Sequence, residues 1–296
     1  MRHLLANFVM PARLAQPSRL RSLAVGLLLL AVASGSIAQT VCLQTVYLTF
    51  DTGSQSQTEL IASLLKKHRI KATFFLANEK TTRGDYSLDA SWANYWKQLV
   101  QEGHAFGSHT FDHVYLKSNT SNLSNKASKA SQSNYFTVKP QFGPRAGQLL
   151  EWSGEQYCAE LNRVKTHFQS LTGHTLSALW RAPGGHVSAA SLAAAAQCGY
   201  QHVGWQTAGA GAGFLGDELN STQFPNSALL KKALTHLKDG DVAMAHLGIW
   251  SRRDAWAPAV LEPLITGLKA KGTCFATLLE HPQFGSGKAL QTTLKF

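Results

Sequence analysis

Strand-like and helix-like segments alternate along this chain from residue 46 to residue 278, and this alternation limits the possible folds. Short runs rich in β-branched and aromatic residues predict strands, and apolar residues at helical spacing predict helices. The expected strands are 46–50, 72–76, 104–108, 176–181, 202–205, 242–246 and 274–278, and the expected helices are 59–67, 92–100, 156–171, 188–197, 227–237 and 260–270. The pattern predicts a parallel α/β fold, with about seven strands forming a distorted (β/α) barrel in one domain over residues 39–296.

The first 38 residues have the pattern of a secretory signal peptide. A basic stretch precedes an apolar run at 23–32, and small residues at 36 and 38 match the requirement of signal peptidase. The alternative is an uncleaved anchor, but the run is shorter than the ~20 residues of a membrane span. No later segment is long and apolar enough to cross a bilayer, so we expect a periplasmic or secreted protein without membrane insertion after cleavage.

The positive charge of the chain does not indicate nucleic-acid binding. The formal charge of +11 includes four arginines of the leader, which leaves +7 for residues 39–296. The lysines and arginines of this part are scattered and form no recognised nucleic-acid motif. Modest basicity on an exported protein suits an anionic cell-wall polymer better.

Residues 117–134 interrupt the alternation, because they are nearly all Ser, Asn, Lys, Thr and Ala without an apolar period. We expect an exposed insertion loop there. Two interpretations remain open, a basic rim for an anionic polymer and a solvated loop without a role.

Ionisable side chains lie at the ends of four predicted strands, namely Asp51, His109, Arg181 and His246. Reactive groups of parallel α/β proteins gather at the carboxyl ends of strands, so we expect these four to lie together. His113 follows His109 by four residues, a spacing that on one helical turn lets both imidazoles share a metal. Each residue alone has a structural explanation, as a turn former, ion-pair partner or core histidine; the joint pattern favours a site.

These motifs, in this order, resemble those of the polysaccharide deacetylases with a NodB homology domain, carbohydrate esterase family 4. The first motif, Thr-Phe-Asp-Asp-Gly, is similar to Thr-Phe-Asp-Thr-Gly at 49–53, and the second, His-Ser/Thr-x-x-His, is complete at 109–113. The third is similar to Arg-Ala-Pro-Gly-Gly at 181–185, and the fifth centres on His246. The fourth is poorly kept, because residues 205–209 contain no acid.

The resemblance implies a NodB-type barrel and metal-dependent removal of N-acetyl groups from an acetylated amino-sugar glycan, such as peptidoglycan or chitin. Asp51 would act as general base, Arg181 would hold it, and His246 would protonate the departing amine. His109 and His113 would bind a divalent, zinc-like metal. The expected substrate-binding residues are Pro183, Trp205, Met244 and Trp250, and core packing is the alternative for the two tryptophans.

The resemblance is broken at Thr52, which stands where the family has an aspartate that is its third metal ligand. A neutral hydroxyl binds a divalent cation more weakly than a carboxylate does. Three outcomes remain open: metal binding with Thr52 or water, substitution by Asp112, or a non-catalytic carbohydrate-binding relative. An amide hydrolase with a non-sugar substrate is a further alternative. The fourth motif also lacks the acid that orients the catalytic histidine, and Asp217 is the expected replacement.

Four cysteines, Cys42, Cys158, Cys198 and Cys274, are expected to form two disulfides in an oxidising compartment. The sequence alone permits three connectivities. Closure of a barrel brings its first and last strands together, which favours Cys42 with Cys274 and leaves Cys158 with Cys198 on successive outer helices. The alternative is free buried thiols.

Overall fold

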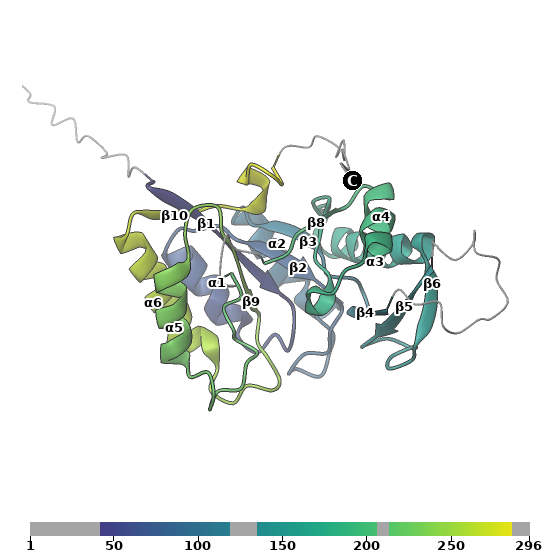
Figure 1. Ribbon diagram of the computed structural model, residues 1–296, viewed down its shortest axis with the longest axis horizontal. Helices are drawn as coiled ribbons and strands as arrows, with labels where there is room; N and C mark the ends of the chain where they lie inside the picture. The colour runs from purple at the N-terminus through teal and green to yellow at the C-terminus, as the bar shows by residue number, and fades with distance from the viewer. Residues whose placement is uncertain (1–41, 119–134, 206–212, 286–296) are drawn as a thin grey trace, which may run out of the picture. The chain divides into compact units, whose positions relative to one another are not determined.

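The fold is described by a computed structural model for residues 42–118, 135–205 and 213–285 (Figure 1). The predicted leader, residues 1–38, lies outside the described residues, as does the predicted insertion loop beyond residue 118.

The main sheet has seven strands, and every ladder in it is parallel. The strands are β1 (Gln44–Asp51), β2 (Thr73–Leu76), β3 (Ala105–Ser108), β7 (Leu179–Trp180), β8 (Gln201–His202), β9 (Val242–His246) and β10 (Thr273–Phe275). Strand β1 pairs with β2, β9 and β10, and the ladder continues from β2 through β3 and β7 to β8. The predicted α/β class and strand number are confirmed.

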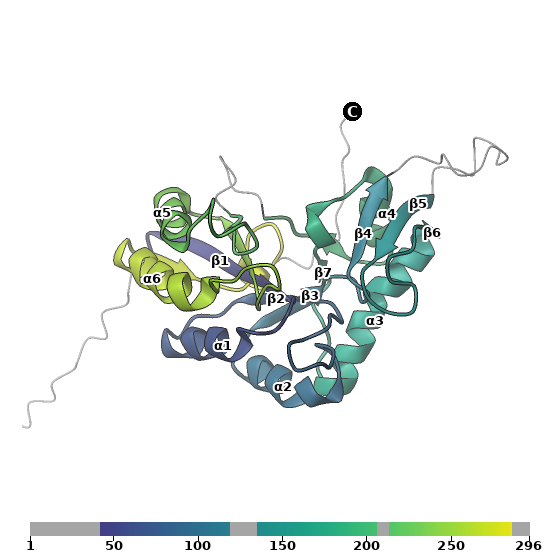
Figure 2. The same ribbon diagram turned by 90° about the horizontal axis from the view of Figure 1, so that it is seen from below.

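Helices cover the outside of this sheet (Figure 2). They are α1 (Thr58–Lys67), α2 (Ala93–Gln101), α3 (Gly154–Thr172), α4 (Ala189–Gln197), α5 (Asn226–His236) and α6 (Trp256–Ala270). Helix α5 packs on α6, α6 on α1, α2 on α3 and α3 on α4. In the part of the chain that the structure describes, no helix combines the length and apolar character needed to cross a bilayer.

Strand β1 is buried on both faces, and its alternation decides which side chains reach the site. Val46, Leu48 and Phe50 join the large apolar cluster beneath the helices. Tyr47 belongs to a separate cluster on the opposite face of the sheet. Because side chains alternate along a strand, Asp51 points to the same face as Tyr47, away from the helices.

Two parts of the sequence interpretation need correction. Three strands, β4 (Val114–Ser118), β5 (Tyr135–Pro140) and β6 (Leu150–Ser153), form a separate antiparallel sheet that we did not predict. Their ladders pair residues far from any tight turn, so no hairpin signal marks them. The predicted strands 176–181, 202–205 and 274–278 are also too long, since β7 and β8 have two residues each and β10 has three.

Both expected disulfides are present. Cys42, just before β1, bonds Cys274 of β10, and Cys158 of α3 bonds Cys198 at the end of α4. The first bridge closes a span of 232 residues and the second a span of 40 residues. In the chain-entropy account, the longer closed loop restricts the unfolded chain more.

We therefore predict that the double variant Cys42→Ser/Cys274→Ser loses about 2–4 kcal/mol of unfolding free energy. Urea unfolding followed by tryptophan fluorescence measures this loss. The matched control, Cys158→Ser/Cys198→Ser, opens the shorter loop and should lose less. An equal or larger loss in the control would contradict the prediction.

Candidate active site

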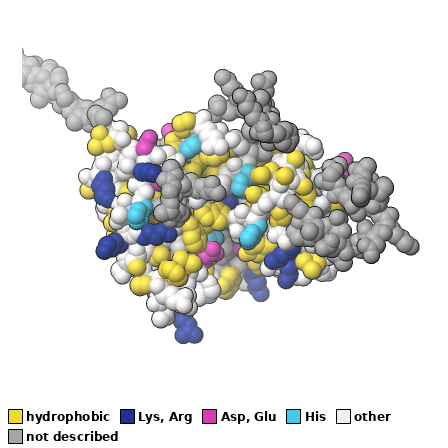
Figure 3. All heavy atoms as spheres, in the orientation of Figure 1, with side chains coloured by type: hydrophobic (Ala, Val, Ile, Leu, Met, Phe, Trp, Pro, Cys, Tyr) yellow, Lys and Arg dark blue, Asp and Glu magenta, His cyan; other side chains and the backbone are white. Residues whose placement is uncertain are grey.

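The register of the parallel strands brings the predicted residues to one edge of the sheet. Asp51 ends β1 and His246 ends β9, and the two are paired in register. The last residues of β3 and β7 are also in register, so His109 and Arg181, which follow them, lie at the same edge. Histidine and acidic side chains reach the surface near the centre of the face seen in Figure 3.

Asp51 and Arg181 form an ion pair that is shielded from water. Asp51 is 2% exposed and Arg181 is fully buried, and Nη1 of Arg181 donates to Oδ1 of Asp51 at 2.8 Å. The guanidinium also donates to Thr49 Oγ1 and to the carbonyl of Val203, and its central carbon lies 4.2 Å from the ring centre of Phe75. Burial raises the pKa of Asp51, but the charge of Arg181, assisted by nearby histidines, outweighs it and lowers the pKa. Asp51 is therefore ionised at neutral pH.

His109 is held as a neutral imidazole. Its Nδ1 lies 2.9 Å from the backbone carbonyl of Arg181, which can only accept, so Nδ1 carries the proton. Its Nε2 lies 3.7 Å from Oδ2 of Asp51. Burial lowers the pKa of His109 to about 4, against the opposing effect of Asp51. The unprotonated Nε2 is thus available to a metal at neutral pH.

His113 lies beside His109, with 5.0 Å between the ring centres, but the predicted helical turn is wrong. The chain instead leaves β3 through a tight loop in which Thr110 and His113 have φ values of 61° and 47°. The hydroxyl of Thr110 accepts from the backbone N–H of Val114, which starts β4 directly after the loop. Nδ1 of His113 is buried and has no hydrogen-bond partner among the described residues.

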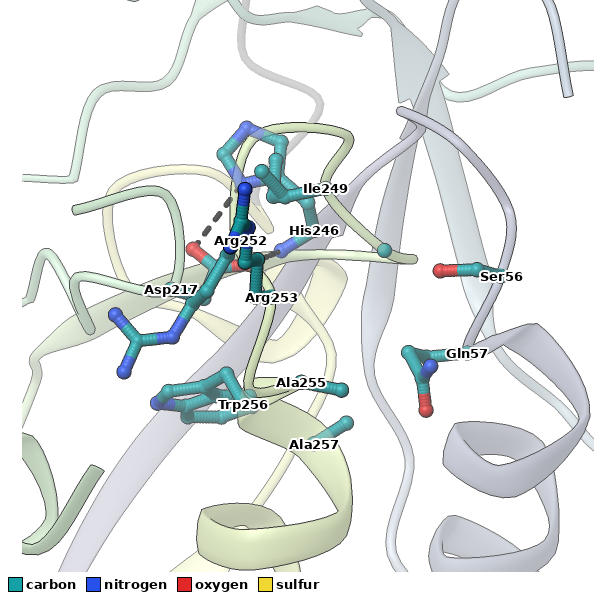
Figure 4. Close-up of a pocket in the computed structure, with 11 residues that line it drawn as sticks. Ser56, Gln57, Asp217, His246, Ile249, Arg252, Arg253, Ala255, Trp256 and Ala257 are labelled. Carbon is teal, nitrogen blue, oxygen red and sulfur yellow. Dashed lines mark hydrogen bonds and ion pairs between the residues drawn. The ribbon is translucent and has the colours of Figure 1, made fainter. Parts of the chain in front are cut away.

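His246 is paired with Asp217, as Figure 4 shows. Nδ1 of His246 donates to Oδ1 of Asp217 at 3.1 Å, and the backbone N–H of His246 donates to Oδ2 at 2.6 Å. Burial lowers the pKa of His246, but Asp217, with smaller effects of Asp51 and Glu218, outweighs it and raises the pKa to about 10. His246 is therefore protonated at neutral pH.

A pocket of about 160 Å³ adjoins the imidazole of His246 (Figure 4). Arg252 and Trp256 contribute to its wall. The Arg252 guanidinium donates to the carbonyls of Leu219 and Phe224, so it holds the segment that carries Asp217.

The surroundings of Thr52 differ from those expected from the sequence. The Thr52 hydroxyl donates to Oε1 of Glu79 at 2.6 Å and accepts from the backbone N–H of Ala77. Asp112, the acid between the histidines, pairs instead with Arg163, with 2.8 Å between Oδ2 and Nη1. That carboxylate is already neutralised, so the interpretation of Asp112 as the replacement is wrong.

The expected substrate-binding residues have different surroundings. Trp205 is partly buried and packs against Gly185, and Pro183 is buried in the same loop after β7. Met244 is 1% exposed, two residues before His246 on β9. Trp250 is 60% exposed. Of the four, Trp250 is thus the most accessible to a ligand.

Sequence reasoning missed two acidic residues near the site. Glu79 lies three residues after the end of β2, and the sequence analysis named no ionisable residue at the end of that strand. Its position after a predicted strand could therefore have marked it as a candidate. Glu218 adjoins Asp217, and its charge acts on His246. Only the folded segment after Gly213 shows that it comes this close.

The histidine pair fits a metal, but as placed it lacks further ligands. In residues 42–118, 135–205 and 213–285, no three His, Cys, Asp or Glu side chains are clustered closely enough to hold a metal ion. His109 offers an unprotonated Nε2, and the buried Nδ1 of neighbouring His113 is without a partner. A divalent metal suited to imidazole would satisfy these groups.

We predict that Asp217→Asn lowers the pKa of His246 from about 10 toward its usual value near 6.5, because the main opposing charge is removed. An NMR titration of the imidazole protons measures the shift. The stabilisation that wild-type His246 gains from its raised pKa should be complete below pH 6.5 and lost as the pH rises through about 10. Asp254→Asn, a change at an acid paired with Arg252, is the control and should leave this titration unchanged. An unaltered pKa of His246 in Asp217→Asn would refute the assignment of Asp217 as the group that raises this pKa.

Two known proteins that are similar to this chain are named as peptidoglycan deacetylases. A peptidoglycan-N-acetylglucosamine deacetylase of Bacillus cereus is 24% identical over 236 residues, which cover 79% of this chain and 86% of the relative. The peptidoglycan-N-acetylmuramic acid deacetylase PdaA of Bacillus subtilis is 26% identical over 242 residues, which cover 79% of this chain and 70% of the relative.

Solved structures share the fold. A family 4 carbohydrate esterase from Streptomyces lividans in complex with acetate has a TM-score of 0.54 and 20% identity, and the match covers 84% of this chain and 98% of that chain. A mutant of BA3943, a CE4 family pseudoenzyme with restored enzymatic activity, has a TM-score of 0.54 and 18% identity, with 80% and 67% covered. The polysaccharide deacetylase family model matches residues 38–203, more than half of the sequence. The chain therefore belongs to the polysaccharide deacetylase family of hydrolases.

Proposed function

We propose that this chain is an exported, metal-dependent deacetylase that hydrolyses N-acetyl groups of an amino-sugar glycan, with peptidoglycan as the favoured substrate. The observation that carries the proposal is the pairing of an ionised Asp51 and a protonated His246 in register at one strand edge. Family membership and the peptidoglycan deacetylases among its relatives support the substrate class.

Asp51 is the proposed general base. Its Oδ1 is occupied by Arg181, while Oδ2 faces His109 at 3.7 Å and can accept a proton from an attacking water. Arg181 is the positioning residue, because its buried charge keeps the carboxylate ionised and fixes its orientation.

His246 is the proposed general acid. Departure of an amine from a tetrahedral centre requires protonation of the nitrogen, since an amide anion is a very poor leaving group. With Nδ1 bonded to Asp217, the protonated ring can donate from Nε2 to the leaving nitrogen. Asp217 thus orients the ring and maintains its charge.

His109 and His113 are the proposed nitrogen ligands of a divalent metal, with zinc favoured. When bound there, the metal would supply Lewis-acid polarisation of the acetyl carbonyl and charge stabilisation at its oxygen. The chain itself supplies the proton transfers on either side, through Asp51 and His246. Trp250 and the partly buried Trp205 are the proposed substrate contacts, and the buried Met244 and Pro183 would support the wall behind them.

Export to the periplasm or the outside of the cell is part of the proposal. The leader pattern of residues 1–38 supports it. The two disulfides also support it, because such bonds persist in oxidising compartments. A peptidoglycan substrate lies outside the cytoplasm, in agreement with both.

We predict that the purified protein, supplied with zinc, releases acetate from an N-acetylated peptidoglycan oligomer and that Asp51→Asn lowers kcat/KM by at least about 100-fold. Removal of the base leaves the attacking water unactivated. The matched control is Asp239→Asn, an acid on the loop before the opposite end of β9, which should retain activity. Acetate release is measured by a coupled enzymatic assay.

Three results would replace this proposal. Absence of turnover with zinc, cobalt or nickel, together with glycan affinity that a chelator does not change, would establish a carbohydrate-binding protein. Turnover confined to non-sugar amides would establish a different amide hydrolase. Undiminished activity of Asp51→Asn would remove Asp51 from the mechanism.

A further inference from the structure

The antiparallel sheet of β4, β5 and β6 begins at the candidate active site. His113 immediately precedes β4, and the ring centre of Tyr115, on that strand, lies 5.1 Å from the ring centre of His113. Tyr115 also lies against the turn that follows Arg181, because a Cβ at Gly184 would be only 2.7 Å from Cε1 of the tyrosine ring. The sheet therefore continues the surface of the site, and Tyr115 joins the two.

The two faces of this sheet differ in character. One face joins an apolar cluster with α3 and α4, through Val114, Phe136, Val138 and Trp152. Side chains alternate along a strand, so Tyr115 and its register partner on β5, Lys139, point to the other face. Lys117 lies on that side too, since its Nζ is 5.2 Å from the ring centre of Tyr115. The surface formed by Tyr115, Lys117 and Lys139 is called the lysine face below.

The charges of the lysine face are not neutralised by acidic side chains of the described part of the chain. Lys117 is exposed and Lys139 is partly exposed, and neither forms an ion pair within residues 42–118, 135–205 and 213–285. The carboxylate of Glu151, on β6, accepts from the hydroxyl of Thr137 instead. Lys and Arg side chains gather near the histidines over this part of the molecule in Figure 3. Uncompensated cations beside a binding site attract an anionic ligand.

The place of the lysine face along β4 indicates which part of a substrate it contacts. Side chains two residues apart on a strand are separated by about 7 Å, so Lys117 is one such step beyond Tyr115 and farther still from His113. A group bound by the lysines thus belongs to a unit next to the sugar that reacts. Peptidoglycan carries carboxylates on its muramic acid units and attached peptides, whereas a chitin-like polymer carries none. The lysine face therefore favours the acidic glycan over the neutral one.

We propose that the lysine face binds carboxylates of an acidic glycan, next to the sugar that reacts, and makes this chain selective for peptidoglycan over chitin-like polymers. This inference rests on the glycan substrate of the proposed function and specifies its class. Tyr115 supplies apolar surface between the reacting sugar and the two lysines. Lys117 and Lys139 are the residues that determine the specificity.

The test is glycan affinity, measured by calorimetry with a chelator present and with acetate assayed afterwards to verify that the glycan is intact. The probes are a tetrasaccharide fragment of peptidoglycan, the same fragment with its carboxylates converted to methyl amides, and chitotetraose. The wild-type protein should bind the native fragment at least about 5-fold more tightly than either neutral probe, because each exposed ion pair contributes a modest gain. This preference should shrink as added salt screens the charges.

Two double variants make the assignment specific. Lys117→Gln/Lys139→Gln should abolish the preference for the native fragment and leave the affinity for chitotetraose unchanged. The matched control, Lys97→Gln/Lys165→Gln, removes two exposed lysines of α2 and α3 and changes the net charge equally, so it should keep the preference. All four side chains reach solvent, so both variants should unfold at the wild-type temperature. In turnover, the first variant should raise KM for the native fragment with kcat nearly unchanged, because the lysines act away from the reacting atoms.

The outcomes separate this inference from the proposed function. Equal affinity of the wild-type protein for the native and amidated fragments would overturn the inference even if acetate is released. Loss of the preference in both double variants would also overturn it, because net charge rather than the lysine face would then recognise the glycan. A preference that is lost only in Lys117→Gln/Lys139→Gln, without acetate release from any probe, would support the lysine face and overturn the deacetylase proposal.

Discussion

The buried ion pair between Arg181 and Asp51 is the interaction on which the arrangement of the site depends. Two charges out of water are tolerated only when geometry and further hydrogen bonds compensate, and removal of one partner typically costs about 3–5 kcal/mol. Arg181 meets this demand by contacts with Thr49, Phe75 and Val203, which belong to different strands or strand ends. Its backbone carbonyl also sets the tautomer of His109. One residue thereby orients the carboxylate and the imidazole together.

Three ionisable groups within this small region hold three different charges at neutral pH, and each has a separate cause. Asp51 stays ionised because a cation lies against it, although burial opposes this. His109 stays neutral because burial dominates its surroundings. His246 stays protonated because Asp217 outweighs burial. Environments that push pKa values apart are how acid and base roles are divided within one site.

The sequence predicted the parts of the site that depend on periodicity. Asp51, His109, Arg181 and His246 follow recognisable strands, and parallel register alone brings such ends to one edge. The prediction of a helical turn at residues 109–113 is wrong. A spacing of four suggests a helix, but the hydroxyl of Thr110 accepts from the backbone of Val114 and stabilises a loop. The antiparallel sheet β4–β6 was missed because its pairing is not marked by short turns.

The contacts of Thr52 could not be predicted from the sequence either, because they depend on residues brought together only by the tertiary fold. Glu79 reaches position 52 only because residues 77–87 fold back on themselves through Ser87, which no local pattern reveals. The exchange of aspartate for threonine at 52 has a physical consequence beyond metal binding. With a neutral residue after Asp51, the end of β1 carries one negative charge, which forms an ion pair with Arg181 and is assisted by the nearby histidines.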